Sequence, residues 1–119
     1  MGWKATLSLP LARWAMRRLS KSVSHPVKAQ RDVLSALLAK GKATAFGRDH
    51  DLKDGLSVAE FQARVPVRDY EGLRGYMERA VKGEEDVVWP GVPLYFCKTS
   101  GTTSGAKYIP LTKDSMPNH

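Results

Sequence analysis

The chain has 119 residues, of which 42% are hydrophobic and 26% charged, so it is long enough for one hydrophobic core and is not a disordered chain. Its single cysteine, Cys97, excludes an internal disulfide and a cysteine-rich metal centre, and we expect a buried structural thiol. No apolar run approaches the roughly 18 residues of a transmembrane helix, so we expect a cytoplasmic protein without a membrane span.

The positive charge of the chain is concentrated at one end. The formal net charge is +7, but residues 1–42 contain nine Lys and Arg against one acid, whereas the remainder contains ten bases and eleven acids. An excess confined to one region is typical of a solvated helix face, so we expect no nucleic-acid partner. Binding of nucleic acid or an anionic membrane by this basic region is the alternative, and it predicts salt-sensitive binding that survives deletion of residues 99–107.

Two helices are predicted in the first part of the chain. Ser8-Leu9-Pro10 is typical of a helix start, because serine caps free N–H groups and proline is tolerated in the first turn. The helix that follows ends near residues 20–24, so residues 1–24 form a basic amphipathic region. A second helix starts at His25-Pro26 and ends at Gly41, for which we expect a left-handed conformation.

Shorter elements follow in the middle of the chain. Residues 44–52 lack a clear period and are predicted to be an ordered connection. Ser57 and Glu60 have the spacing of a capping box, which predicts a short helix that Pro66 stops.

The pattern changes from helical to extended after one more helix, which Asp69 caps and Gly83 closes. Residues 94–97 and 108–111 are predicted to be strands of a hairpin. Thr112 is placed to cap a final helix.

The connection between these strands has the composition of a polyphosphate site. Its glycines let the backbone turn and approach a ligand closely, its five hydroxyls and free N–H groups can donate to phosphate oxygens, and its lysine supplies a compact positive charge. The residues are Thr99, Ser100, Gly101, Thr102, Thr103, Ser104, Gly105, Ala106 and Lys107. The spacing excludes a Walker loop, because the glycines are four positions apart and Ala106 separates Gly105 from the lysine. A polar turn without a ligand is the alternative on composition alone.

The string TSGTTSGAK resembles the signature loop of the adenylate-forming superfamily, which includes acyl-coenzyme A synthetases, luciferases and peptide-synthetase adenylation domains. Three longer segments, VPVRDYEGL (65–73), GEEDVVWPG (83–91) and YFCKTSGTTSGAKYIPLT (95–112), resemble the N-terminal third of the auxin-responsive, Gretchen Hagen type, acyl acid amido synthetases. The resemblance extends over roughly residues 26–117.

This resemblance implies an α/β fold in which residues 1–119 are the N-terminal part of a single ATP-binding domain, mostly helical, with a β-hairpin that carries the phosphate-binding loop. It implies a ligase in which a small carboxylic acid attacks the α-phosphate of Mg²⁺-bound ATP, after which an amino acid or another amine displaces AMP to form an amide. Thr99 to Gly105 and Lys107 would bind the nucleotide phosphates, and Lys107 would also offset charge as pyrophosphate departs. No dedicated protein metal site is implied.

The resemblance also implies that the chain is a fragment. The motifs for adenine, ribose and the acyl group would lie beyond His119, so we expect a longer reading frame and no adenylation by residues 1–119 alone. The alternative is a non-catalytic module that binds nucleotide phosphates.

Overall fold

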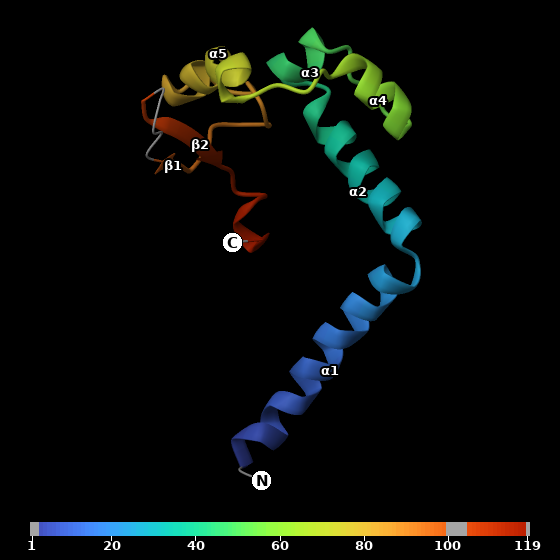
Figure 1. Ribbon diagram of the computed structural model, residues 1–119. Coiled ribbons are helices and arrows are strands. Elements are labelled where there is room, and N and C mark those ends of the chain that lie inside the picture. The colour runs from blue at the N-terminus through green and yellow to red at the C-terminus, as the bar shows by residue number, and fades with distance from the viewer. Residues whose placement is uncertain (1–2, 100–104, 119) are drawn as a thin grey trace. The chain divides into compact units, whose positions relative to one another are not determined.

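The computed structural model describes residues 3–99 and 105–118, with the backbone alone described at residues 3–7, 18, 21, 22 and 118. The chain divides into two compact units, residues 1–34 and 35–119. The described ranges contain five α-helices, a two-stranded antiparallel sheet and a C-terminal 3-10 turn (Figure 1). This mixture of helix and sheet is consistent with the expected α/β class.

The first unit consists of α1 (Trp3–Ser24) and the first half of α2 (Pro26–Gly41). The predicted helix start at residues 8–10 is wrong, because α1 begins at Trp3 and contains Pro10 in its interior. Proline fixes φ at a helical value, so the helix continues through it with the loss of one backbone hydrogen bond. The predicted end near residues 20–24 and the start of α2 at Pro26 are confirmed.

The end of α2 differs from the prediction. Gly41 is the last helical residue and is not among the glycines with positive φ. Its carbonyl accepts the backbone N–H of Thr44 at 3.1 Å and the Thr44 hydroxyl at 2.7 Å. Because this carbonyl is already satisfied, the turn needs no left-handed residue.

The segment 44–52, predicted to be a connection, contains the short helix α3 (Ala45–Asp49). Thr44 caps α3, since its hydroxyl accepts the backbone N–H of Gly47 at 3.0 Å. A helix of five residues is too short to show a hydrophobic period in the sequence and too short to be stable alone, so its stability depends on tertiary contacts.

Two backbone hydrogen bonds attach α3 to a distant part of the chain. The N–H of Ala45 donates to the carbonyl of Asp86 at 2.7 Å, and that of Phe46 donates to the carbonyl of Val87 at 2.9 Å. The buried side chains of the second unit include residues on both sides of this junction. They are Leu38, Thr44, Ala45, His50, Ala80 and Val87.

An aromatic cluster extends this core. The Phe46 ring stacks on His50 with centroids 4.2 Å apart and meets the edge of Tyr76 at 5.3 Å. The Tyr76 hydroxyl donates to Asp49 at 2.7 Å, and burial together with this hydrogen bond raises the pKa of Tyr76. The core of the second unit therefore joins α3 to the helix that carries Tyr76.

The helix α4 (Val58–Arg64) confirms the predicted capping box. The backbone N–H of Ser57 donates to the Glu60 carboxylate at 2.8 Å, and the N–H of Glu60 donates to the Ser57 hydroxyl at 3.3 Å. The Ser57 hydroxyl also donates to the Glu60 carboxylate at 2.7 Å, and this hydrogen bond, together with the one from the Ser57 N–H, lowers the pKa of Glu60. The helix ends before Pro66, as expected.

The helix α5 (Tyr70–Val81) begins after the predicted cap, Asp69, whose carboxylate accepts the backbone N–H of Gly72 at 3.0 Å. Gly83 follows the helix with φ of +88°, a left-handed value that favours glycine. Both predicted ends of this helix are confirmed.

The predicted hairpin is also confirmed. The strands β1 (Tyr95–Thr99) and β2 (Lys107–Leu111) pair antiparallel, and α5 packs against β2 (Figure 1). Cys97 is exposed, so the expected burial of its thiol is wrong. The reason is that one face of this two-stranded sheet has no second layer over it in the described part of the chain.

The last described segment forms a tight turn instead of an α-helix. Thr112 does act as a cap, since its hydroxyl accepts the backbone N–H of Ser115 at 3.3 Å and its own N–H donates to the Ser115 hydroxyl at 3.0 Å. The turn then continues as the 3-10 segment Met116–Asn118.

Candidate functional site

The candidate loop connects the two strands of the hairpin. In the strand register Thr99 lies opposite Lys107, so the pairing holds the two ends of the loop side by side. Of the predicted phosphate-binding residues, the structure describes Thr99, Gly105 and Lys107. The others, Ser100, Gly101, Thr102, Thr103 and Ser104, lie outside the described residues.

The described end of the loop has a backbone conformation that requires glycine. Gly105 has φ of +83°, in the left-handed region where a side chain is strained. Gly105 therefore turns the chain into β2, two residues before Lys107. Thr99, at the other end, is exposed.

Lys107 is half-buried, and its environment leaves its charge without a counter-ion from the described part of the chain. Its Nζ lies 5.7 Å from the centroid of the Tyr70 ring. No acid in residues 3–99 or 105–118 forms an ion pair with it. An ammonium held on an aromatic face remains a positive charge that an anionic ligand can use.

Tyr70 also holds the backbone beside this lysine. Its hydroxyl oxygen accepts the backbone N–H of Tyr108 at 2.9 Å, which joins the first residue of α5 to the second residue of β2. Sequence reasoning did not identify Tyr70 as a site residue. Its place directly after the cap Asp69 predicts a helix start but not a contact with a strand 38 positions away.

A small cavity of about 130 Å³ lies between α5 and β2. Its lining is mostly apolar and includes Tyr70, Met77, Val81 and Tyr108. Ligand pockets for small molecules are typically about 300 to 1,000 Å³, so this cavity is too small for a nucleotide. It marks imperfect packing under the hairpin and not a second binding site.

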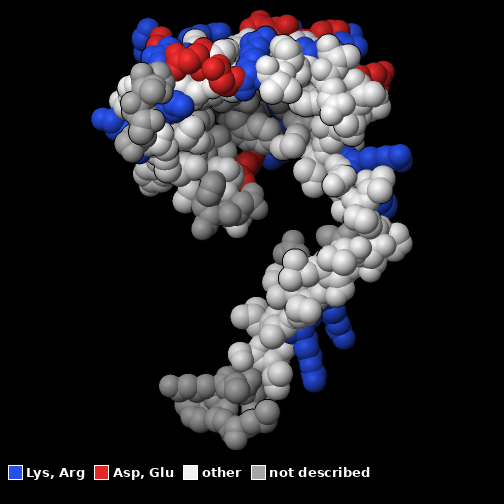
Figure 2. Space-filling view, viewed as in Figure 1, with Lys and Arg blue, Asp and Glu red and all other residues white. Residues whose placement is uncertain are grey.

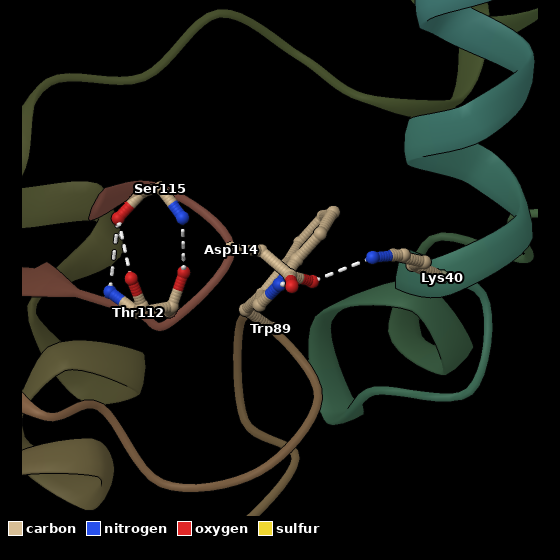
Figure 3. A network of polar contacts seen from close by, with 5 residues as sticks. All are labelled: Lys40, Trp89, Thr112, Asp114 and Ser115. Atoms are coloured by element: carbon tan, nitrogen blue, oxygen red, sulfur yellow. Dashed lines mark hydrogen bonds and ion pairs between the residues drawn. The ribbon is translucent and has the colours of Figure 1, made fainter. Parts of the chain in front are cut away.

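A second polar network lies at the other end of β2. Figure 3 shows the Asp114 carboxylate between the Lys40 ammonium, at 2.6 Å, and the Trp89 indole N–H, at 3.1 Å. These two hydrogen bonds lower the pKa of Asp114. The neighbouring cavity, of about 310 Å³, is lined by this carboxylate together with Leu37, Trp89 and the residues that follow β2. Since Asp114 already has two partners, we interpret the network as a link between α2 and the end of the hairpin.

Charge is distributed differently over the two units. Figure 2 shows acidic and basic side chains interspersed over the second unit, whereas the charged side chains visible on α1 are basic. Within the described ranges no helix is long and apolar enough to cross a membrane. No group of three or more His, Cys, Asp or Glu in the same ranges could hold a metal ion.

The chain belongs to the GH3 family: residues 15–119 match the model of the GH3 family N-terminal domain. The loop and its two strands lie inside the matched range, as do α2 to α5.

Curated relatives of this chain include amido synthetases from two plants. A probable indole-3-acetic acid-amido synthetase, GH3.2, from Oryza sativa subsp. japonica is 34% identical over 89 residues, which are 73% of this chain and 14% of that protein. The indole-3-acetic acid-amido synthetase GH3.15 from Arabidopsis thaliana is 32% identical over 110 residues, which are 90% of this chain and 18% of that protein. The chain thus spans less than a fifth of the length of these relatives.

Proposed function

We propose that this chain carries the ATP phosphate-binding hairpin of an acyl acid amido synthetase. The observation that supports the proposal is Lys107, a half-buried ammonium with no described acid in ion-pair contact, at the base of a glycine-containing hairpin loop. The chain belongs to the GH3 family, and its curated relatives are named amido synthetases. This membership supports the assignment of the hairpin to an amido synthetase.

In this proposal the loop binds the β- and γ-phosphates of ATP. Gly105 keeps the backbone close to the ligand, the hydroxyl and N–H groups of residues 99–104 donate to phosphate oxygens, and Lys107 opposes the charge of the departing pyrophosphate. Such preorganised donors accelerate phosphate chemistry by electrostatic stabilisation. In this proposal the protein contributes little covalent chemistry of its own.

The proposed overall reaction has two steps. A carboxylate attacks the α-phosphate of ATP and releases pyrophosphate, and an amine then attacks the acyl adenylate and releases AMP. Two relatives are named a probable indole-3-acetic acid-amido synthetase and an indole-3-acetic acid-amido synthetase, so the proposed substrate classes are an auxin-like acid and an amino acid. Mg²⁺ would enter with the ATP phosphates, as is usual for this ion.

The enzyme-level test is ATP–pyrophosphate exchange by the protein expressed from its complete gene, with indole-3-acetic acid and a panel of other carboxylic acids. We expect exchange that depends on the acid, and its loss in Lys107→Ala. Acid-independent ATP binding without exchange would favour a non-catalytic nucleotide-binding module instead. Normal exchange in Lys107→Ala would contradict the proposed role of the loop.

A further inference from the structure

We propose that Tyr70 is a positioning residue for the phosphate site, acting by holding Lys107 and Tyr108, the first two residues of β2, in place. This inference rests on the proposed function of the hairpin. It assigns to the start of α5 a role that the loop sequence does not reveal.

The Tyr70 side chain makes two contacts with adjacent residues of β2. Its hydroxyl oxygen accepts the N–H of Tyr108 at 2.9 Å, and its ring lies 5.7 Å from the Lys107 Nζ. The first contact fixes the backbone that carries the lysine, and the second restricts the lysine side chain. One residue thus controls both the position and the direction of the ammonium.

The backbone of Lys107 is also fixed by its strand pairing with Thr99. Pairing alone fixes where a strand residue lies but leaves a long side chain free to rotate. Lysine loses much side-chain entropy when it is ordered. A partner that orders it before the ligand arrives therefore strengthens binding by preorganisation.

An aromatic partner suits this purpose better than an acid. A carboxylate beside Lys107 would order the side chain but would also neutralise it and repel a phosphate. The face of an aromatic ring attracts a cation while leaving its full charge available. The absence of an ion pair between Lys107 and any described acid agrees with this arrangement.

Tyr70 is itself held by the start of α5. Asp69 caps the helix by accepting the N–H of Gly72 at 3.0 Å. The guanidinium of Arg74, one turn along, lies 5.9 Å from the same ring and is held by Glu71 through hydrogen bonds of 2.8 and 2.7 Å. The ring therefore projects from an ordered helical turn.

The test uses the 119-residue chain and inorganic pyrophosphate as the probe, with affinity measured by calorimetric titration. Tyr70→Phe keeps the ring and removes the hydrogen-bond acceptor, so we expect binding about fivefold weaker. Tyr70→Leu removes both contacts, and we expect a loss of about tenfold or more. Tyr76→Phe is the matched control, because it lies on the same helix but its hydroxyl bonds Asp49. It should bind pyrophosphate as the wild type does.

A double-mutant cycle separates positioning from a general structural effect. If Tyr70 acts through Lys107, Tyr70→Leu should cost little further affinity in a Lys107→Ala background. A second readout needs no ligand: in Tyr70→Phe the Tyr108 amide should exchange faster with solvent, and in Tyr70→Leu the Lys107 methylene protons should lose their ring-current shift.

The outcomes distinguish this inference from the proposed function. Saturable binding by the wild type, with unchanged affinity in both Tyr70 variants or with equal losses in the presence and absence of Lys107, would overturn the inference alone. No saturable binding by the wild type would overturn the proposed function and the inference with it. Weakened binding only where Lys107 is present is the result that we expect.

Discussion

At the scale of single residues, Gly47 has the least room for a side chain among the glycines that the structure describes. A Cβ added there would overlap the carbonyl oxygen of Gly41 and lie 2.8 Å from the Cα of Lys42. These are backbone atoms at the end of α2, so they cannot move aside as a flexible side chain would. We expect Gly47→Ala to lower the free energy of unfolding by about 1 to 3 kcal/mol, measured by urea denaturation.

The control for this change is Gly75→Ala in α5, where an added Cβ would meet no atom within 4 Å. Replacing an open helical glycine with alanine should stabilise the chain by about 0.5 to 1 kcal/mol. Similar effects of the two substitutions would show that Gly47 is not closely packed.

Asp114 makes a pH-dependent contribution to stability. The hydrogen bonds from Lys40 and Trp89 lower its pKa below the ordinary 3.8, so the folded state favours the ionised carboxylate. This contribution is fully present above the ordinary pKa and is lost as pH falls through the lower folded value. We expect Asp114→Asn to destabilise the chain at pH 7 and the difference from wild type to shrink steadily below pH about 4. Urea unfolding of the wild type and of Asp114→Asn at pH 7 and below pH about 4 measures this difference in stability. A difference that grows on acidification would contradict the stabilising role of the ionised carboxylate.

Residue-level prediction from sequence succeeded where a short local rule applies. Ser57 with Glu60, Asp69 and Gly83 all act at helix ends as their chemistry indicates, because each satisfies backbone groups only a few positions away. Tyr70 could not be found in the same way. Its partners lie in β2, and no local rule connects a helix start with a strand that follows much later in the chain.

At the scale of elements, α3 is a helix that depends on tertiary contacts and that the sequence pattern does not predict. Its first two N–H groups donate to the carbonyls of Asp86 and Val87, and Val87 is only 1% exposed. The sequence of residues 44–52 contains too few positions for a helical period. The start of α1 was missed for a different reason: proline usually marks the first turn of a helix, but here the helical backbone continues through Pro10.

The contact between α3 and residue 87 can be tested directly. We expect Val87→Ala to cost about 1.5 to 2.5 kcal/mol through lost burial and an unfilled space. The amide of Phe46 should then exchange faster, because its acceptor lies on the loosened segment. Val67→Ala is the control, since Val67 is fully exposed and its truncation should change stability by less than about 0.5 kcal/mol. Unchanged exchange at Phe46 would show that Val87 does not hold α3 in place.

At the scale of the whole molecule, the candidate phosphate site lies in the part of the chain with little net charge. Residues 1–42 carry nine bases and one acid, whereas the remainder, which includes the hairpin and its supporting helix, carries ten bases and eleven acids. Phosphate binding at the hairpin must therefore come from local geometry, namely the loop backbone and the held ammonium of Lys107. The hairpin and family were predictable because the loop motif is distinctive, but the two-unit division of the chain was not, since no break in composition marks residue 34.

Titration of the chain with Mg²⁺-ATP at low and at physiological salt tests this central claim most directly. We expect one saturable site, weakened about tenfold or more in Lys107→Ala, because a charge-assisted contact to phosphate is lost. Cys97→Ala is the control, since that thiol is exposed on the same hairpin. His50 is buried against Phe46, so its truncation would report on stability instead. Equal affinity in wild type and Lys107→Ala, with binding that disappears as salt is raised, would contradict a phosphate site at the hairpin and would assign ATP binding to the basic N-terminal region.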